Sequence, residues 1–215
     1  NGVDLEFYNP VEIDAGNFRD KHGFKPDDLL FFYGGILGHA QGLEVIIHAA
    51  SMLKDLYKVH FIIQGEGPLK TQLMNLASSM ELPMVHFLPA VSKAEMPGIL
   101  KAVDVALVPL RNLPLFQGAI PSKVFEALAM KVPLLLGVAG EAKTHFIDKA
   151  KAGWHFEPEN ASDLAENIRY IHSNPFLVKE YGENARNYVD QVFNRNRIAL
   201  DFFAQINRLY QEPLA

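Results

Sequence analysis

Short apolar runs alternate with amphipathic helical stretches along residues 29–157, and this alternation constrains the fold more than any other feature of the chain. The short runs are typical of buried strands, and the stretches between them place apolar residues three and four positions apart, as helices do. A repeated strand and helix is the pattern of βα units that feed a parallel sheet. We therefore predict a doubly wound, Rossmann-like α/β/α fold with six parallel strands and helices on both faces.

The predicted elements follow one another along the whole chain. Strands are expected at residues 29–33, 59–63, 85–88, 105–108, 134–136 and 154–156. Helices are expected between them at residues 43–56, 68–80, 93–102, 122–130 and 142–150. After Pro158 the pattern changes to three helices without strands, at residues 163–172, 175–191 and 197–210, which we interpret as an outer helical layer.

The last of these helices carries an apolar face formed by Phe202, Phe203, Ile206 and Tyr210. Packing into the core is its simplest interpretation. The alternative is that this helix covers part of another domain, which would leave apolar surface exposed on this chain.

Composition limits the possible functions. With 215 residues, 49% hydrophobic and 21% charged, the chain is typical of a soluble globular domain. A net charge of −5 argues against nucleic acid as a partner. The chain has no cysteine, which excludes disulfides and thiolate metal sites, and its eight histidines form no metal-ligand motif, so we expect no metal. No apolar stretch is long enough to span a membrane.

The segment from residue 108 to 130 contains the most informative candidate site. It predicts a strand, a loop and a helix that opens with Pro121, Ser122 and Lys123, with Glu126 one turn further along. The free N–H groups of the first turn, the helix dipole and the Lys123 ammonium favour a phosphate, whereas the Glu126 carboxylate could accept hydrogen bonds from sugar hydroxyls. The combination suggests a nucleotide or sugar phosphate. The alternative is an exposed ion pair between Lys123 and Glu126.

Three further loops follow predicted strands, where ligands bind in sheets of this kind. A glycine-rich loop covers residues 34–42, and glycine allows a ligand to approach the backbone closely. A Gly65-Glu66-Gly67-Pro68 turn follows the second strand. The third loop, residues 88–92, has few polar side chains, but its backbone groups could pair with a nucleobase while Leu88 or Val91 packs on the face of the base.

These loops, in this order, resemble the donor-binding, C-terminal half of GT-B glycosyltransferases, specifically the family 4 of retaining nucleotide-sugar transferases. The resemblance covers nearly the whole chain. NGVD (1–4) is similar to the start of this half, YGGILGHAQGLE (33–44) to the glycine loop, QGEGP (64–68) to the second turn, and PSKVFEALAMKVP (121–133) to the helix with the nucleotide-binding glutamate. The Gln41-Gly42 pair is similar to the bacterial capsule and O-antigen subgroup, such as the fucosamine-transferase-like members.

The resemblance implies a role for each matching position. Glu126 would hold the ribose hydroxyls, and Ser122, Lys123 and Val124 would lie against the diphosphate. The donor phosphate and sugar would rest on Gly35, Ile36 and Gly38. The base would contact Leu88 and Val91, and Gly65 and Gly67 would shape the adjacent wall.

The sequence departs from the family pattern at two places. Many members have a glutamate eight residues before the ribose-binding one, where this chain has Gly118, preceded by Gln117. We therefore name no catalytic residue, although both positions belong to the candidate donor site. Many members also have an arginine and a lysine near the first glycine loop, whereas this chain has Gln41. Charge neutralisation would then depend on Lys123, the helix terminus and Arg111.

The resemblance implies transfer of a hexose or N-acetylated amino sugar from a nucleoside diphosphate, with UDP expected, to a hydroxyl acceptor in bacterial cell-surface polysaccharide synthesis. Residues 1–215 would form the donor-binding domain. An N-terminal acceptor-binding domain would be absent from this chain, so the chain alone would be inactive. The full protein would be cytoplasmic or peripheral at the inner face of the bacterial membrane, with a lipid-linked acceptor as a plausible partner. A UDP-sugar 2-epimerase-like or phosphorylase-like GT-B half and a ligand-free Rossmann-type interaction module remain alternatives.

Overall fold

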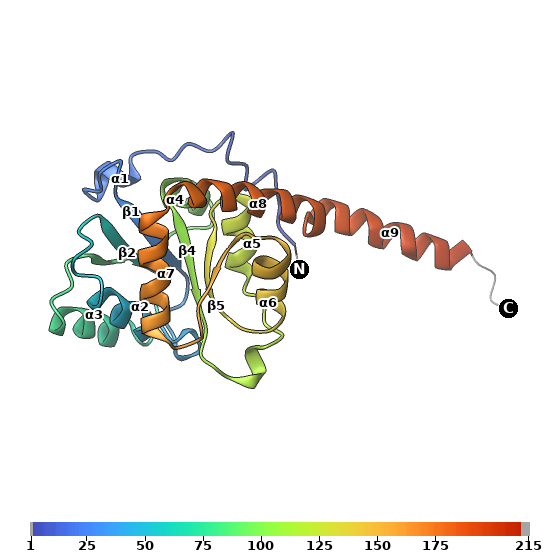
Figure 1. Ribbon diagram of the computed structural model, residues 1–215. Coiled ribbons are helices and arrows are strands. Elements are labelled where there is room, and N and C mark those ends of the chain that lie inside the picture. The colour runs from blue at the N-terminus through green and yellow to red at the C-terminus, as the bar shows by residue number, and fades with distance from the viewer. Residues whose placement is uncertain (1, 212–215) are drawn as a thin grey trace.

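The computed structural model describes residues 2–211 and confirms the predicted six-stranded parallel sheet (Figure 1). The strand order is β3-β2-β1-β4-β5-β6, and every neighbouring pair is parallel. The bounds are β1 Leu29–Gly34, β2 Val59–Gln64, β3 Val85–Leu88, β4 Val105–Pro109, β5 Leu134–Gly137 and β6 Gly153–His155. The order reverses between β1 and β4. The loops beyond the carboxyl ends of these strands are where such sheets bind ligands.

Helices cover both faces of the sheet, and each face has its own apolar core. On one face, Phe31 and Tyr33 of β1 pack under α2 Glu44–Ser51, α3 Lys70–Ser79 and α7 Ala161–Ser173. On the other face, Leu30 and Phe32 pack with α4 Met96–Ala102 and α5 Ser122–Ala129. Because neighbouring residues of β1 enter opposite cores, the strand is apolar throughout, as strands covered on both faces are.

Several predicted helices differ from those observed. The helix predicted over residues 43–56 ends at Ser51, because the following turns are closed by bonds between residues three apart, such as that from the Met52 N–H to the Ala49 carbonyl. The helix predicted over residues 142–150 divides into α6 Glu141–Lys143 and a π-helix, Thr144–Lys149. The sequence analysis missed three short helices, which are too brief for periodicity to reveal: α1 Phe18–Lys21, η1 His39–Gln41 and η2 Pro114–Phe116.

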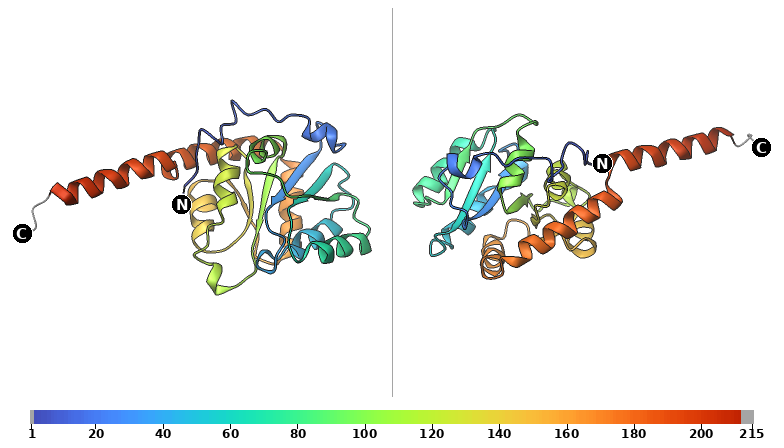
Figure 2. Two further views of the ribbon diagram at one scale, coloured as in Figure 1. Left: turned by 180° about the vertical axis from the view of Figure 1, so that it is seen from behind. Right: turned by 90° about the horizontal axis from the view of Figure 1, so that it is seen from above.

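The C-terminal helices form only part of the expected outer layer. Both α7 and α8 Phe176–Val192 pack on the body of the domain, and α8 contacts α5. Helix α9 Arg195–Gln211 instead extends away from the body (Figures 1 and 2). Phe202 is 64% exposed, Phe203 62% and Tyr210 91%. The interpretation of this apolar face as core packing is therefore wrong, and the exposed surface agrees with the alternative.

A segment before α1 crosses the molecule to meet the C-terminal helices. Val3 forms a bridge with Asn194 at the start of α9. One Arg186 nitrogen, Nη1, donates to the carbonyl oxygens of Tyr8 (2.7 Å) and Ala129 (2.8 Å), which fastens this segment to α8 and α5. None of the helices within residues 2–211 is both long and apolar enough to cross a bilayer.

Candidate functional site

The loops that follow β1 and β2 interlock at the carboxyl edge of the sheet. The Gly35 N–H donates to the Gln64 carbonyl at 2.9 Å. Gly65 has φ +147°, and a Cβ there would lie 1.8 Å from the Gly35 oxygen. Gly67, at φ +158°, faces the Leu37 backbone in the same way, with a Cβ 2.4 Å from its oxygen. Glycine is therefore required at both predicted positions, because only glycine allows this backbone packing.

Lys123 lies beside this pair of loops. Its Nζ is 3.8 Å from the centre of the Tyr33 ring, a cation–π contact. A Cβ on Gly35 would come within 3.0 Å of the same Nζ, so the ammonium lies over the glycine loop. Burial lowers the pKa of Lys123 to about 7, although the nearby Glu126 carboxylate opposes this shift. Lys123 thus occupies a partly buried position and does not form the exposed ion pair considered as an alternative.

Glu126 lies one turn further along the same helix face. Burial raises the pKa of its carboxyl group, while the Tyr8 hydroxyl and the charges of Lys93 and Lys123 lower it. Lys123 and Glu126 both line a small cavity that Met96 of α4 also lines. The structure therefore brings together the phosphate-binding and hydroxyl-binding candidates that the sequence predicted for α5.

At the start of α5, Ser122 and Lys123 have free backbone N–H groups for the expected diphosphate contact, whereas Val124 has neither a free N–H nor an exposed side chain. Pro121 caps the helix with φ −61° and ψ 137°, and Ser122, the first helical residue, is exposed. The Val124 N–H donates to the Pro121 carbonyl at 3.0 Å, and the Val124 side chain is fully buried. The remaining donors of the first turn belong to Ser122 and Lys123, whose N–H groups lack partners within the helix.

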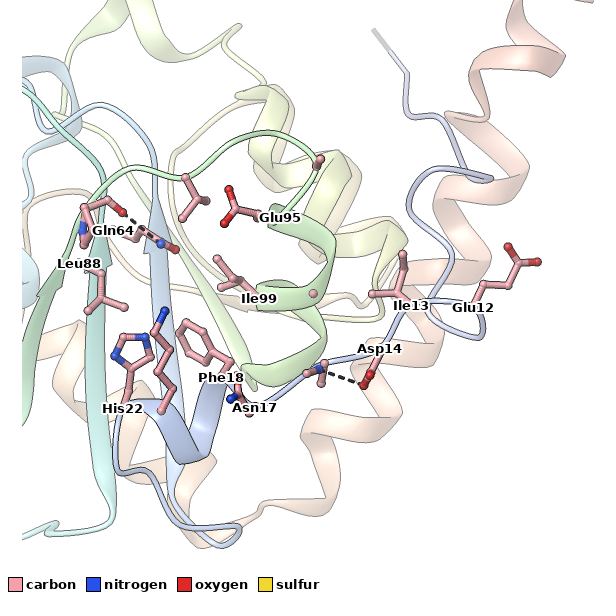
Figure 3. Close-up of a pocket in the computed structure, with 17 residues that line it drawn as sticks. Glu12, Ile13, Asp14, Asn17, Phe18, His22, Gln64, Leu88, Glu95 and Ile99 are labelled. Carbon is pink, nitrogen blue, oxygen red and sulfur yellow. Dashed lines mark hydrogen bonds between the residues drawn. The ribbon is translucent and has the colours of Figure 1, made fainter.

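A cavity of about 510 Å³ adjoins the site on the side of β3 and α4 (Figure 3). Leu88 and Val91, the predicted base contacts, both line it. Figure 3 shows Gln64 and Leu88 on the strand side and Ile99 of α4 opposite them. A second cavity, of about 280 Å³, is lined by Gly35, Ile36, Gly65 and Val91, among others. The predicted loops at residues 34–42, 65–68 and 88–92 therefore meet around these cavities at the carboxyl edge of the sheet.

Arg111 has partners that the sequence analysis did not foresee. Its Nε donates to the His39 carbonyl at 2.7 Å. Its terminal nitrogens form ion pairs with Glu44 (3.3 Å) and Glu159 (2.9 Å). The guanidinium therefore fastens the β1 loop to the body of the domain, and its predicted role in phosphate neutralisation would require it to leave these carboxylates.

The other predicted donor contacts lie around the rim. Gln117 and Gly118 are exposed, and the Gln117 carbonyl accepts from the Glu141 N–H at 2.8 Å. Gln41 lies in η1, and its Oε1 would be 3.1 Å from a Cβ on Gly38. The structure brings Gln41 and Gly38 together, whereas it places Gln117 and Gly118 on the separate loop before α5.

Sequence reasoning missed three residues at the site. Tyr33 supports Lys123 and donates its hydroxyl to the Ile36 carbonyl at 2.7 Å. Gln64 is 4% exposed; its Nε2 donates to the Pro89 carbonyl at 3.2 Å, and its Oε1 is buried without a partner in the described part of the chain. Met96 lines both the small cavity and the one beneath the glycine loops. Only Gln64 carried a signal, as a polar residue that directly follows the apolar run 61–63.

Comparison with known proteins agrees with this geometry. The chain is 25% identical over 202 residues to the putative colanic acid biosynthesis glycosyl transferase WcaI of Escherichia coli, covering 93% of this chain and 48% of WcaI. It is 24% identical over 198 residues to the D-rhamnosyltransferase WbpZ of Pseudomonas aeruginosa, covering 89% and 48%. The chain thus spans about half the length of these curated relatives.

Solved structures share the fold. HepE of Anabaena, solved in complex with UDP and glucose, superimposes with a TM-score of 0.80 at 19% identity, over 96% of this chain and 55% of HepE. The C-terminal domain of the group 1 glycosyl transferase LpcC of Francisella tularensis gives 0.75 at 20% identity, over 90% of this chain and all of that domain. The family model described as glycosyl transferases group 1 matches residues 14–188. This chain therefore belongs to the group 1 glycosyl transferases and has the fold of the C-terminal half of a GT-B enzyme.

Proposed function

We propose that this chain binds the nucleotide-sugar donor of a bacterial polysaccharide glycosyltransferase, with UDP as the nucleotide and a hexose or N-acetylated amino sugar as the transferred group. The position of Lys123 and Glu126 on one face of α5, opposite the loops of β1 and β2, is the observation that carries this proposal. The polysaccharide names of the relatives and the UDP complex of HepE support it.

In this proposal the donor lies across the carboxyl edge of the sheet. The diphosphate lies against Lys123 and the first turn of α5, the ribose hydroxyls donate to Glu126, and the base lies at the loop that carries Leu88 and Val91. As the bond to the sugar breaks, negative charge builds on the departing diphosphate. A fixed ammonium and helix N–H groups stabilise this charge more than they stabilise the bound donor. Our scheme uses no metal.

We further propose that an N-terminal acceptor-binding domain completes the enzyme. The exposed apolar side of α9, which includes Phe202, Phe203 and Ile206, would pack against that domain. The chain spans about half of its curated relatives, which supports a second domain of similar size. This chain alone should then bind nucleotide without turnover, and transferase activity in these 215 residues alone would contradict that expectation.

Calorimetric titration with UDP, GDP and ADP tests the donor site. We expect UDP to bind best, with Kd near about 1 mM or below, and both Glu126→Ala and Lys123→Ala to weaken it. Glu180→Ala, on α8 and away from the site, is a control that should bind as the parent does. Equal binding of UDP by the parent and the two α5 variants would contradict the proposed placement.

A further inference from the structure

The Tyr8 hydroxyl is an unexplained polar group beside the proposed site. The side chain is 3% exposed, and its Oη is buried with no hydrogen-bond partner of normal geometry among residues 2–211. A phenylalanine would fill the same space without burying a hydroxyl. A buried polar group without a partner lowers stability, so this hydroxyl is expected to have a role other than packing.

Several contacts fix Tyr8 against the helix that carries Glu126. Nη1 of Arg186 donates to both the Tyr8 carbonyl and the Ala129 carbonyl, and Ala129 lies three residues after Glu126 on α5. The Tyr8 ring packs in the same apolar core as α5 and lies edge to face with Phe7 at 4.9 Å. These contacts hold Tyr8 next to α5.

Glu126 is the carboxylate that acts on this hydroxyl. The carboxylate and the phenol affect each other: the carboxylate helps to raise the pKa of Tyr8, after burial, and the hydroxyl lowers the pKa of Glu126. Glu126 is partly exposed and lines a cavity, whereas the Tyr8 side chain is almost completely buried.

We infer that Tyr8 is a positioning residue for Glu126: its hydroxyl donates to the buried side of the carboxylate and leaves the exposed side free for the ribose hydroxyls of a nucleoside diphosphate. This inference rests on the proposed function. The other charges that act on the pair are Lys93 before α4, Lys123 on α5 and Arg195 at the start of α9.

A double-mutant cycle in UDP affinity tests the inference, using Tyr8→Phe, Glu126→Ala and both together. Tyr8→Phe should weaken UDP binding by about three- to tenfold, the effect of one hydrogen bond, and by less than about twofold when Glu126 is already Ala, which has no acceptor. The acidic limb of the UDP affinity profile should also move to higher pH, since loss of the hydroxyl raises the pKa of Glu126 and the carboxylate form is needed for binding.

Tyr188→Phe provides a matched control. Its Oη lies 2.8 Å from Nδ1 of His145, away from the site, so its loss should change stability and leave UDP affinity unchanged. Equal losses in both Glu126 backgrounds, or an unshifted pH profile, would overturn the positioning role alone. No UDP binding by the unsubstituted chain would overturn the proposed function and this inference together. Should Tyr8→Phe not fold, the unsubstituted chain still provides a test. A UDP affinity that does not fall at acidic pH would show that the Glu126 carboxylate form is not needed, and would count against the inference.

Discussion

The lowered pKa of Lys123 makes UDP affinity depend on pH in a predictable direction. Burial brings this pKa to about 7, and a bound diphosphate favours the charged form. If only the charged form binds, the competent fraction falls from about one half at pH 7 to about one thirtieth at pH 8.5, which weakens binding roughly fifteenfold. Calorimetry at several pH values, in buffers of different ionisation enthalpy, should also detect uptake of about half a proton at pH 7.

Two controls isolate the ammonium from other groups. Lys123→Met removes the titrating group and should give weaker binding with a nearly flat profile over the same pH range. Uridine lacks the diphosphate, so its affinity reports any titration of the base or of other groups near it. A fifteenfold decline that persists in Lys123→Met, or binding without proton uptake, would refute the assignment of this titration to Lys123.

Two further predictions concern stability. Gly65→Ala should destabilise the fold by about 3 kcal/mol and lower Tm by roughly 6–12 °C, because the Cβ would lie 1.8 Å from the Gly35 oxygen at a positive φ. In the control Gly118→Ala the new Cβ would meet no described atom within 4 Å, so thermal unfolding should show a loss of less than about 0.5 kcal/mol. Similar Tm values for the two variants would contradict the argument. Burial, followed by the charges of His60 and His22, lowers the pKa of His86 to about 4, so the free energy of unfolding should fall as pH decreases from about 6.5 toward 4. Urea unfolding should show a smaller fall for His86→Gln, and an equal fall would be evidence against this source.

The sheet could be predicted from the sequence because it is covered on both faces. Its strands are mostly apolar runs, and the predicted strand 85–88 coincides with β3 while the others differ by one or two residues. Whether α9 packs on this domain could not be predicted in the same way. An amphipathic helix indicates that its apolar side will be covered, but the pattern is the same whether the cover is this domain or another one.

The candidate site was predicted in its loops but only partly in its side chains. Strand order places the loops at one edge, so Gly35, Gly65 and Glu126 could be expected to approach each other. The partners of Arg111 could not, because Glu44 and Glu159 are 67 and 48 residues away in the chain. Tyr8 was missed for the same reason, since only the tertiary structure brings the segment before α1 to α5.

The bridge formed by Arg186 also affects the order in which the domain assembles. Its two bonds from Nη1 join residues that are 178 and 57 positions apart. Long loops close late because the entropy cost precedes any gain from contacts. The segment that carries Tyr8 should therefore dock after α8 has packed against α5. A nascent or truncated chain without α8 could form the glycine loops, yet it would leave Tyr8 unattached and Glu126 without its inner neighbour.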